Sequence, residues 1–375
     1  SRDEAGNIGR SVPERTLRGR HRRGQIVPGR GGITVRYIGV QPPMTPTPAG
    51  RPYEVAIDAR GATYNWTLRK VGAPDVVQRS RRAKGGPLTR RAPRGESGLY
   101  LFEARTATRR TAVPVPVDDR RNNRVLVILP STTWQGRNTL DDDGDGLPNT
   151  LELGVPARLS RVFARGLPEG ITENEGPLLA RLHREGRSYD LTTDTAIAIG
   201  RGPKIRGHRG VLLAGDTRWL TEDVRRQLRA FVAGGGVLAS MGTQSLRSEV
   251  RQTRRRLLDP TPLLREDLFG ARLDPIRRET VDLQNLEDDE RLQLFAGEEG
   301  LFPAVEAWEA TTSIGGEARL ASNAVTPDNQ QVIVAVRFGR GVVIRTGIPG
   351  FATRLGTDPA SAELMGRIWT LLRTG

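Results

Sequence analysis

The chain has 375 residues, of which 36% are hydrophobic, so it is long enough for two domains with ordinary cores. It has no cysteine and no run approaching 18 apolar residues, which excludes disulfides, thiolate metal sites, a cysteine nucleophile and a membrane-spanning helix. The net charge of +15 belongs to the first third, because residues 1–124 hold 26 basic and 10 acidic side chains, whereas residues 125–375 hold 32 and 33.

The N-terminal third reads as a tail followed by short strands. Residues 1–30 are rich in Arg and Gly without apolar periodicity and predict a basic flexible tail or linker. Within 31–120, turns separate stretches that alternate like strands, and no helical periodicity intervenes. These stretches are 33–40, 52–59, 62–71, 98–105 and 109–117. They predict a small antiparallel, immunoglobulin-like β-sandwich with Trp66 in its core and an exposed, basic hairpin or loop at 79–97.

The pattern changes near residue 121. The run NRVLVILP at 123–130 is continuously apolar, as in a strand that is buried on both faces. Strands at 188–194, 210–219 and 237–242 then alternate with helices at 175–186, 221–236 and 360–374, and a hairpin covers 331–350. The alternation predicts that 121–375 is a three-layer α/β domain with a mainly parallel sheet. The less regular stretch around 251–330 is expected to be an insertion that departs from this sheet.

The arginine excess has two interpretations. It can reflect the codon bias of a GC-rich, actinobacterial-type genome, or it can serve binding to polyanions. Few aromatic side chains are interleaved with the basic ones, which argues against specific nucleic-acid recognition. The partner expected for the basic N-terminal third is therefore an anionic polymer or another component of the cell envelope.

The acidic stretch DDDGDGLPNTLE at 141–152 matches a 12-residue calcium-binding loop. It has oxygen donors at every liganding position and a glycine at the sharp turn. The predicted ligands are Asp141, Asp143, Asp145, the backbone carbonyl of Leu147, Asn149 and a bidentate Glu152. Pro148 lacks an N–H and no second such loop occurs in the chain, so we expect a single structural calcium clip rather than a paired sensor. The alternative is a solvated acidic turn.

The predicted strands of the α/β domain end in polar segments at 130–138, 192–194, 215–219 and 241–245. Open α/β sheets bind ligands at the carboxyl ends of their strands. The side chains expected to line a ligand pocket there are Trp134, Asn138, Asp194, Asp216, Arg218, Trp219, Thr243 and Gln244. A structural ion pair between Asp216 and Arg218 is the alternative to a binding pair.

The order of these motifs resembles a known family. VILPxxTWQxxN, YDLTTD, VLLAGDTRWL, a helix and GGGVLASMG follow one another over most of 123–250. Together they are similar to the large (beta) subunit of N,N-dimethylformamidase and its relatives. The strand SGLYLFEAR is similar to the β-domain that precedes the catalytic domain in that family. The resemblance implies a flavodoxin-like, class I glutamine amidotransferase-like fold and an amide hydrolase with a mononuclear iron held by two tyrosines and a glutamate.

The sequence departs from the family at those ligands. GDTRW resembles a family segment of the type GHxEYW, with Asp216, Arg218 and Trp219 in place of His, Glu and Tyr. WQGRN has Gly136 and Arg137 where the family offers a tyrosine, and Tyr189 is the one tyrosine of residues 125–375. The resemblance therefore implies the family fold without its metal site. No GxSxG nucleophile elbow is present either.

Three functions remain open from the sequence. The first is a calcium-stabilised, non-catalytic binding or structural module, that is, a pseudoenzyme, at the surface of a bacterium or outside it. The second, which is the alternative to the first, is a divergent hydrolase of amides or carbohydrates that uses Asp194 or Asp216 as acid or base. The third, a polyanion-binding unit, is compatible with the first. The calcium loop resembles DxDxDG repeats of bacterial surface proteins, so we expect an export signal or anchor upstream of Ser1.

Overall fold

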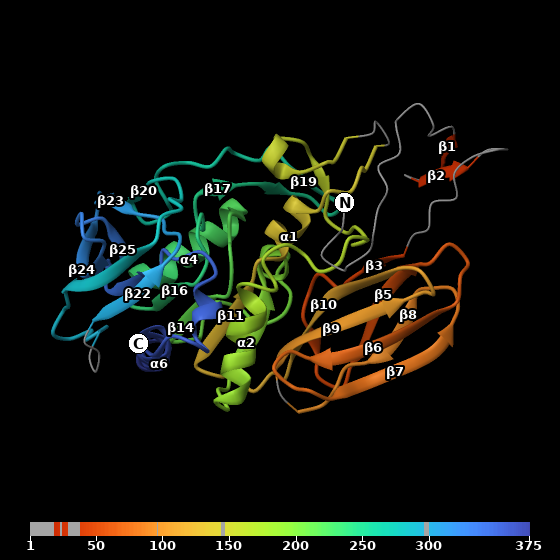
Figure 1. Cartoon of the computed structure of the whole chain (residues 1–375), viewed down its shortest axis with the longest axis horizontal. Helices are drawn as coiled ribbons and strands as arrows, with labels where there is room; N and C mark the ends of the chain where they lie inside the picture. The colour runs from red at the N-terminus through yellow and green to blue at the C-terminus, as the bar shows by residue number, and fades with distance from the viewer. Residues whose placement is uncertain (1–18, 23–24, 29–37, 96, 144–146, 296–299) are drawn as a thin grey trace.

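The computed structural model describes residues 19–22, 25–28, 38–95, 97–143, 147–295 and 300–375 (Figure 1). Of the predicted tail, only β1 (Gly19–Arg22) and β2 (Gln25–Pro28) are described, and they pair antiparallel. The rest of the tail and the first half of the strand predicted at 33–40 lie outside the described residues. None of the described helices is long and apolar enough to cross a membrane.

Two sheets form residues 39–118, one with the order β4-β10-β9-β6-β7 and one with the order β3-β5-β8. Their strands are β3 (Gly39–Gln41), β4 (Thr47–Pro48), β5 (Pro52–Asp58), β6 (Tyr64–Lys70), β7 (Val76–Ala83), β8 (Leu88–Arg91), β9 (Gly98–Arg105) and β10 (Arg110–Asp118). All pairs are antiparallel except β4 with β10. Trp66 is buried and stacks on Phe102 with ring centroids 5.3 Å apart, which confirms it as a core residue.

The exposed hairpin or loop predicted at 79–97 contains the end of β7 and the whole of β8, which do not pair with each other. β7 pairs with β6 in the larger N-terminal sheet, whereas β8 pairs with β5 in the smaller one, so the segment crosses from one sheet to the other. The boundary predicted between residues 120 and 121 falls in the link between β10 and β11 and stays a prediction. In Figure 1 the two N-terminal sheets (orange) lie beside α2.

An eleven-stranded sheet occupies the centre of residues 125–345. Its path runs β13-β11-β14-β16-β26-β25-β24-β21-β22, and β20 and β23 join it beside β25. The strands are β11 (Val125–Leu129), β13 (Asp190–Thr193), β14 (Gly210–Leu213), β16 (Val237–Ser240), β20 (Ala271–Leu273), β21 (Val281–Glu287), β22 (Leu301–Val305), β23 (Thr311–Ile314), β24 (Ala318–Val325), β25 (Gln331–Phe338) and β26 (Gly341–Arg345). The first five strands of the path run parallel, and every pair from β26 onward is antiparallel.

Short strands and helices complete this part. The strands are β12 (Ala157–Arg158), β15 (Trp219–Leu220), β17 (Ser248–Glu249), β18 (Arg251–Gln252) and β19 (Arg256–Leu258). The helices are α1 (Ser131–Arg137), the 3-10 turn η2 (Leu151–Leu153), α2 (Glu175–Arg184), α3 (Asp194–Ala198), α4 (Glu222–Ala233), α5 (Phe351–Arg354) and α6 (Pro359–Thr374). Successive residues of β14 face opposite sides of the sheet, so Leu213 packs in the core that holds Leu228 of α4 and Leu212 in the core that holds Ile368 of α6.

The prediction of a three-layer α/β fold of the flavodoxin or class I glutamine amidotransferase type is wrong. The structure is 36% strand and 17% helix, and its central sheet is mixed. The reason lies in the connection from β16 to β26, whose described residues hold nine strands and no helix. Antiparallel strands from this connection extend the sheet where a doubly wound fold would continue with helix-connected parallel strands. Residues 251–330, which have no clear periodicity in the sequence, supply most of them.

Candidate functional site

The carboxyl ends of β11, β14 and β16 bring three loops together. β11 leads into α1, β14 into residues 214–218, and β16 into residues 241–245. The last two loops touch through their backbones, because a Cβ at Gly242 would lie 2.3 Å from the backbone nitrogen of Asp216. Glycine at 242 therefore sets how closely these two loops approach.

An ion-pair cluster occupies this edge of the sheet. Arg137, at the end of α1, places NH1 3.2 Å from Oδ2 of Asp216 and Nε 3.2 Å from Oε1 of Glu152. Arg218 donates to the same Glu152 oxygen at 2.8 Å, and its guanidinium carbon lies 4.5 Å from the ring centre of Trp219. Burial raises the pKa of Asp216 and the Arg137 guanidinium opposes that rise. Both acids of this cluster, Asp216 and Glu152, are thus paired with arginine.

A further carboxyl group, that of Glu175, lies close to this cluster. Glu175, the first residue of α2, is 1% exposed and accepts a hydrogen bond from the indole N–H of Trp134 at 3.2 Å. Its Oε2 has no hydrogen-bond partner. Burial raises the pKa of Glu175 to about 8, so the group carries a proton at neutral pH. The missing side chain of Gly215 provides its space, since a Cβ there would lie 2.3 Å from Oε1.

Another acidic residue of this edge, Glu309, belongs to the segment before β23. Arg247 donates to its Oε1 at 2.7 Å and the backbone N–H of Gln244 to its Oε2 at 3.1 Å. Both side chains of the Arg247–Glu309 pair are at most 5% exposed. Burial raises the pKa of Glu309, and Arg247 opposes that rise. Nearby, Arg345 at the end of β26 is paired with the buried Asp267.

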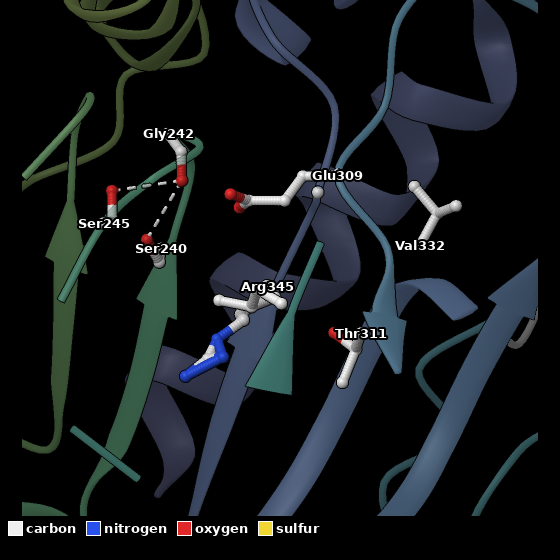
Figure 2. Close-up of a pocket in the computed structure, with 9 residues that line it drawn as sticks. Ser240, Gly242, Ser245, Glu309, Thr311, Val332 and Arg345 are labelled. Carbon is white, nitrogen blue, oxygen red and sulfur yellow. Dashed lines mark hydrogen bonds between the residues drawn. The ribbon is translucent and has the colours of Figure 1, made fainter. Parts of the chain in front are cut away.

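Glu309 and Arg345 both line a small polar cavity (Figure 2). Its lining residues are Ser240, Gly242, Ser245, Leu273, Glu309, Thr311, Val332, Arg345 and Gly347. In Figure 2 the hydroxyls of Ser240 and Ser245 turn to the carbonyl oxygen of Gly242, at 3.4 and 3.1 Å. The cavity volume of about 10 Å³ leaves room for a single water molecule.

Six of the eight predicted pocket residues lie at this edge. Asp216 and Arg218 belong to the ion-pair cluster, and Thr243 gives a backbone hydrogen bond to Asp216. Gln244 contacts Glu309, and Trp134 contacts Glu175. Trp219 is fully buried under Arg218, so it packs rather than lines a pocket.

The other two have inward partners of their own. Asp194 begins α3 and is 1% exposed. Its Oδ1 accepts hydrogen bonds from the Ser131 hydroxyl at 2.6 Å and from the backbone nitrogens of Thr132 and Thr195. Burial raises the pKa of Asp194 to about 6. Asn138 donates to Gln135 and to the carbonyl of Val162.

Five charged residues of this region that form ion pairs or are buried were not predicted from the sequence. These are Arg137, Glu175, Arg247, Glu309 and Arg345. A usable signal exists for the last two, because AWEA at 307–310 and VVIRTG at 342–347 each place one charge within an apolar run. A buried charge requires a partner. The identity of the partner could not be read, since the paired residues are far apart along the chain.

The predicted calcium loop is described in part. Asp141 Oδ1 accepts from the Asp143 backbone at 3.2 Å, and Asp143 Oδ2 accepts from the Asn149 amide at 3.3 Å. Buried Arg161 donates to the carbonyl of Asn149 at 2.8 Å, which fastens the base of the loop. The carboxylate oxygens of Asp141 and Asp143 are ligands of the kind that a hard cation prefers, whereas Asn149 Oδ1 accepts a hydrogen bond from the backbone N–H of Asp142. Glu152 does not fit as arranged, because its carboxylate faces the two arginines described above.

The remaining predicted calcium ligands add little. Leu147 is 66% exposed, and Asp145 lies outside the described residues.

His208 and Tyr189 lie away from the carboxyl edge. His208 Nε2 is 3.1 Å from Asp190 Oδ2 at the amino end of β13, and Tyr189 packs edge-on against Trp369.

Residues 89–282, slightly more than half of the chain, match the family model described as N,N-dimethylformamidase beta subunit-like, C-terminal. No curated protein matches the sequence. Among solved structures, similar chains include the β-galactosidases of Rahnella sp. R3 and of Bacillus circulans sp. alkalophilus and an exo-β-1,4-mannosidase of Opitutaceae bacterium strain TAV5. Their identities are 12, 11 and 10%, over 52, 67 and 68% of this chain, with TM-scores of 0.36, 0.36 and 0.35. The match spans 26, 30 and 35% of those enzymes.

Proposed function

The chain belongs to the N,N-dimethylformamidase beta subunit-like, C-terminal family, and from that premise we propose that it is a non-catalytic member, a binding or structural module whose ligand-facing edge is closed by ion pairs. One observation carries the proposal. At the carboxyl edge of the parallel strands the charged side chains are paired with one another, and the polar cavity beside them has room for only about one water molecule. A cavity of that size is too small for even a simple amide and for any sugar.

The residues at the family's metal-binding positions support the same conclusion. A family site with two tyrosines and a glutamate, as the resemblance implies, would need iron-binding oxygens where this chain has Arg218 and Trp219. A guanidinium repels a cation, and the Trp219 side chain is buried beneath it. The donor set of this edge therefore does not fit that iron site.

The test is a turnover assay with a matched variant. Purified protein, with and without added ferrous iron, is incubated with N,N-dimethylformamide and simple primary amides, and amine release is measured. We expect no release above the protein-free rate. Turnover that Asp216→Asn abolishes while the melting temperature stays within about 1 °C would overturn the proposal. Exposed Asp328→Asn is the matched control, because its carboxylate lies in a surface turn.

The alternative is a divergent hydrolase, and one observation favours it. Glu175, Asp216 and Glu309 all have raised pKa values at one edge of one sheet. Perturbed carboxyl groups gather at catalytic sites. Against this, Glu175 and Glu309 are buried beyond the reach of a substrate, which leaves Asp216 as the acid or base. Detectable hydrolysis lost in Asp216→Asn would favour this alternative.

We also propose that the loop at 141–152 binds one calcium ion through Asp141, Asp143, Asn149 and the carbonyl of Leu147. The hydrogen bonds that link Asp143 to Asp141 and to Asn149 keep these three residues close together, which supports the site. To bind the ion, Asn149 Oδ1 would have to leave the backbone N–H of Asp142. Glu152 would complete the ligand set only by leaving Arg137 and Arg218. Structural calcium of this kind suits a compartment rich in calcium, so we propose that the protein works outside a bacterial cell or at its surface. Metal analysis of the dialysed protein tests the loop; absence of calcium in the wild type would refute it.

The basic N-terminal third is proposed to bind an anionic polymer of the cell envelope. β7 is an edge strand, and its Arg79, Arg81 and Arg82 are exposed. Clustered arginines attract polyanions in a salt-dependent manner. Retention on immobilised polyphosphate should fall as sodium chloride rises, and Arg79→Gln with Arg81→Gln should weaken it. Arg226→Gln, at an exposed position of α4, is the control. Retention that ignores salt would refute the idea.

A further inference from the structure

We propose that Asp118, Asp119 and Asp190 bind a divalent cation through their carboxylate oxygens. The bound cation would join the N-terminal sheets to the mixed sheet. One carboxylate oxygen of each residue lies within 4.8 Å of those of the other two. Asp118 ends β10, whereas Asp190 begins β13, so the three residues come from two different sheets. The site is separate from the calcium loop at 141–152 and from the carboxyl edge.

A buried oxygen without a partner points to a ligand here. Asp118 is 2% exposed, and its Oδ2 receives no hydrogen bond. Its Oδ1 accepts from the backbone N–H of Leu191 at 3.0 Å and contacts the Ser97 hydroxyl at 3.4 Å. A carboxylate oxygen removed from water with no donor is costly unless a proton or a cation satisfies it. The two adjoining carboxylates add negative charge beside this oxygen, and a divalent cation would offset the charge of all three groups.

Two positive side chains contact the cluster directly, and a third, the buried Lys70, lines the same small cavity as Ser97 and Asp119. Arg121 contacts Asp119 with Nε 3.2 Å from Oδ2, but its side chain is 60% exposed and its charge is screened by water. His208 contacts Asp190 at 3.1 Å, and the backbone and side-chain nitrogens of Asn123 donate to the other oxygen of Asp190. Asp119 Oδ1 also meets the Ser97 hydroxyl at 3.1 Å and the backbone N–H of Arg121 at 3.2 Å.

Calcium or magnesium suits these donors. Three carboxylates and a serine hydroxyl are hard oxygen ligands, and neither ion requires the nitrogen or sulfur ligands that zinc prefers. Because the ligands lie on both sides of the link between β10 and β11, a bound ion would hold the two groups of sheets together. This role adds to the hydrogen bond from Leu191 to Asp118, which already connects β13 to the end of β10.

The experiment uses the full chain, stripped with EDTA, with CaCl2 and MgCl2 as separate probes. The background is Asp143→Asn, which removes a ligand of the other predicted site. In this background, saturating cation should raise the melting temperature by about 2 °C or more. Adding Asp118→Asn should abolish the rise, while adding Asp75→Asn, an exposed aspartate before β7, should leave it intact.

Asp118→Asn should fold, because asparagine keeps an oxygen for the Leu191 amide and removes one like charge. Asp119→Asn, at a less buried position, is the second variant and should weaken the response in the same way. No response of Asp143→Asn to either ion would overturn the proposal, and so would a response that survives both second-site changes. If metal analysis finds one ion per chain in both the wild type and Asp143→Asn, the 141–152 loop fails as a site and this one stands.

Discussion

Replacing Glu175 by glutamine should remove most of a pH-dependent loss of stability. In the folded protein the Glu175 carboxyl is fully buried, with one hydrogen bond from Trp134 and with Gly215 against it. Burial raises its pKa from 4.5 to about 8, against the opposing effect of the Trp134 hydrogen bond. A glutamine has the same shape, keeps a carbonyl for the indole N–H and carries no charge at any pH.

The sign follows from proton uptake. Because the pKa of the folded state is above that of the unfolded state, the native protein holds one extra proton between about pH 4.5 and pH 8. The stabilising contribution is therefore full below pH 4.5 and is lost as pH rises to 8. At 1.36 kcal/mol per pKa unit, the loss in unfolding free energy is roughly 5 kcal/mol. Glu175→Gln should be the more stable protein at pH 8 by an amount of that order.

Urea unfolding at pH 5, 6, 7, 8 and 9 measures this difference. The wild-type free energy of unfolding should fall with pH relative to Glu175→Gln, with the change complete near pH 8. Asp194, whose pKa is raised to about 6, titrates in part of the same range. Its contribution cancels because both proteins contain it. Glu173→Gln, an exposed position two residues earlier, should behave as the wild type. Parallel pH profiles of wild type and Glu175→Gln would show that Glu175 ionises at its ordinary pKa and would refute the reasoning.

Three other outcomes are expected. Gly215→Ala should lower the free energy of unfolding by about 1–3 kcal/mol, because its Cβ would overlap the Glu175 carboxyl, and urea unfolding measures the loss. Glu309→Gln should cost roughly 3–5 kcal/mol by leaving Arg247 buried without a countercharge; a loss below 1 kcal/mol in thermal or urea unfolding would contradict that pairing. Excess EDTA should lower the melting temperature of the wild type more than that of Asp143→Asn, and equal shifts by scanning calorimetry would count against calcium in the loop.

Local signals in the sequence predicted several elements correctly. The helix expected at 221–236 is α4, and the Thr221 hydroxyl accepts from the backbone of Val224 as an N-cap should. The hairpin expected at 331–350 is β25 and β26, with its turn at Gly339 and Arg340. Each of these depends on residues close together in the chain, so composition and periodicity were sufficient to find it.

The pairing of distant segments was not predictable in this way. The alternation of strands and helices up to residue 242 suggested that the same pattern continued, but the strands from β18 to β25 pair antiparallel instead. The candidate site shows the same limit. Asp216 was found from its place after a strand, whereas its partner Arg137 lies 79 positions earlier and Glu309 lies 62 positions after Arg247. Which charges meet is decided by the tertiary fold and not by local pattern.

The position of β26 has a consequence for how the chain folds. Val237 of β16 pairs with Val342 of β26, so about one hundred residues must be gathered before this parallel pair can close. Closing a loop of that length costs roughly 4 kcal/mol of chain entropy, and non-local parallel pairing is slow. Before β26 pairs with it, β16 is an edge strand with unpaired backbone groups, although all four of its residues are buried in the native sheet. Exposed apolar edges pair with other chains. A chain shortened before residue 341 would keep that edge permanently and is expected to aggregate during synthesis.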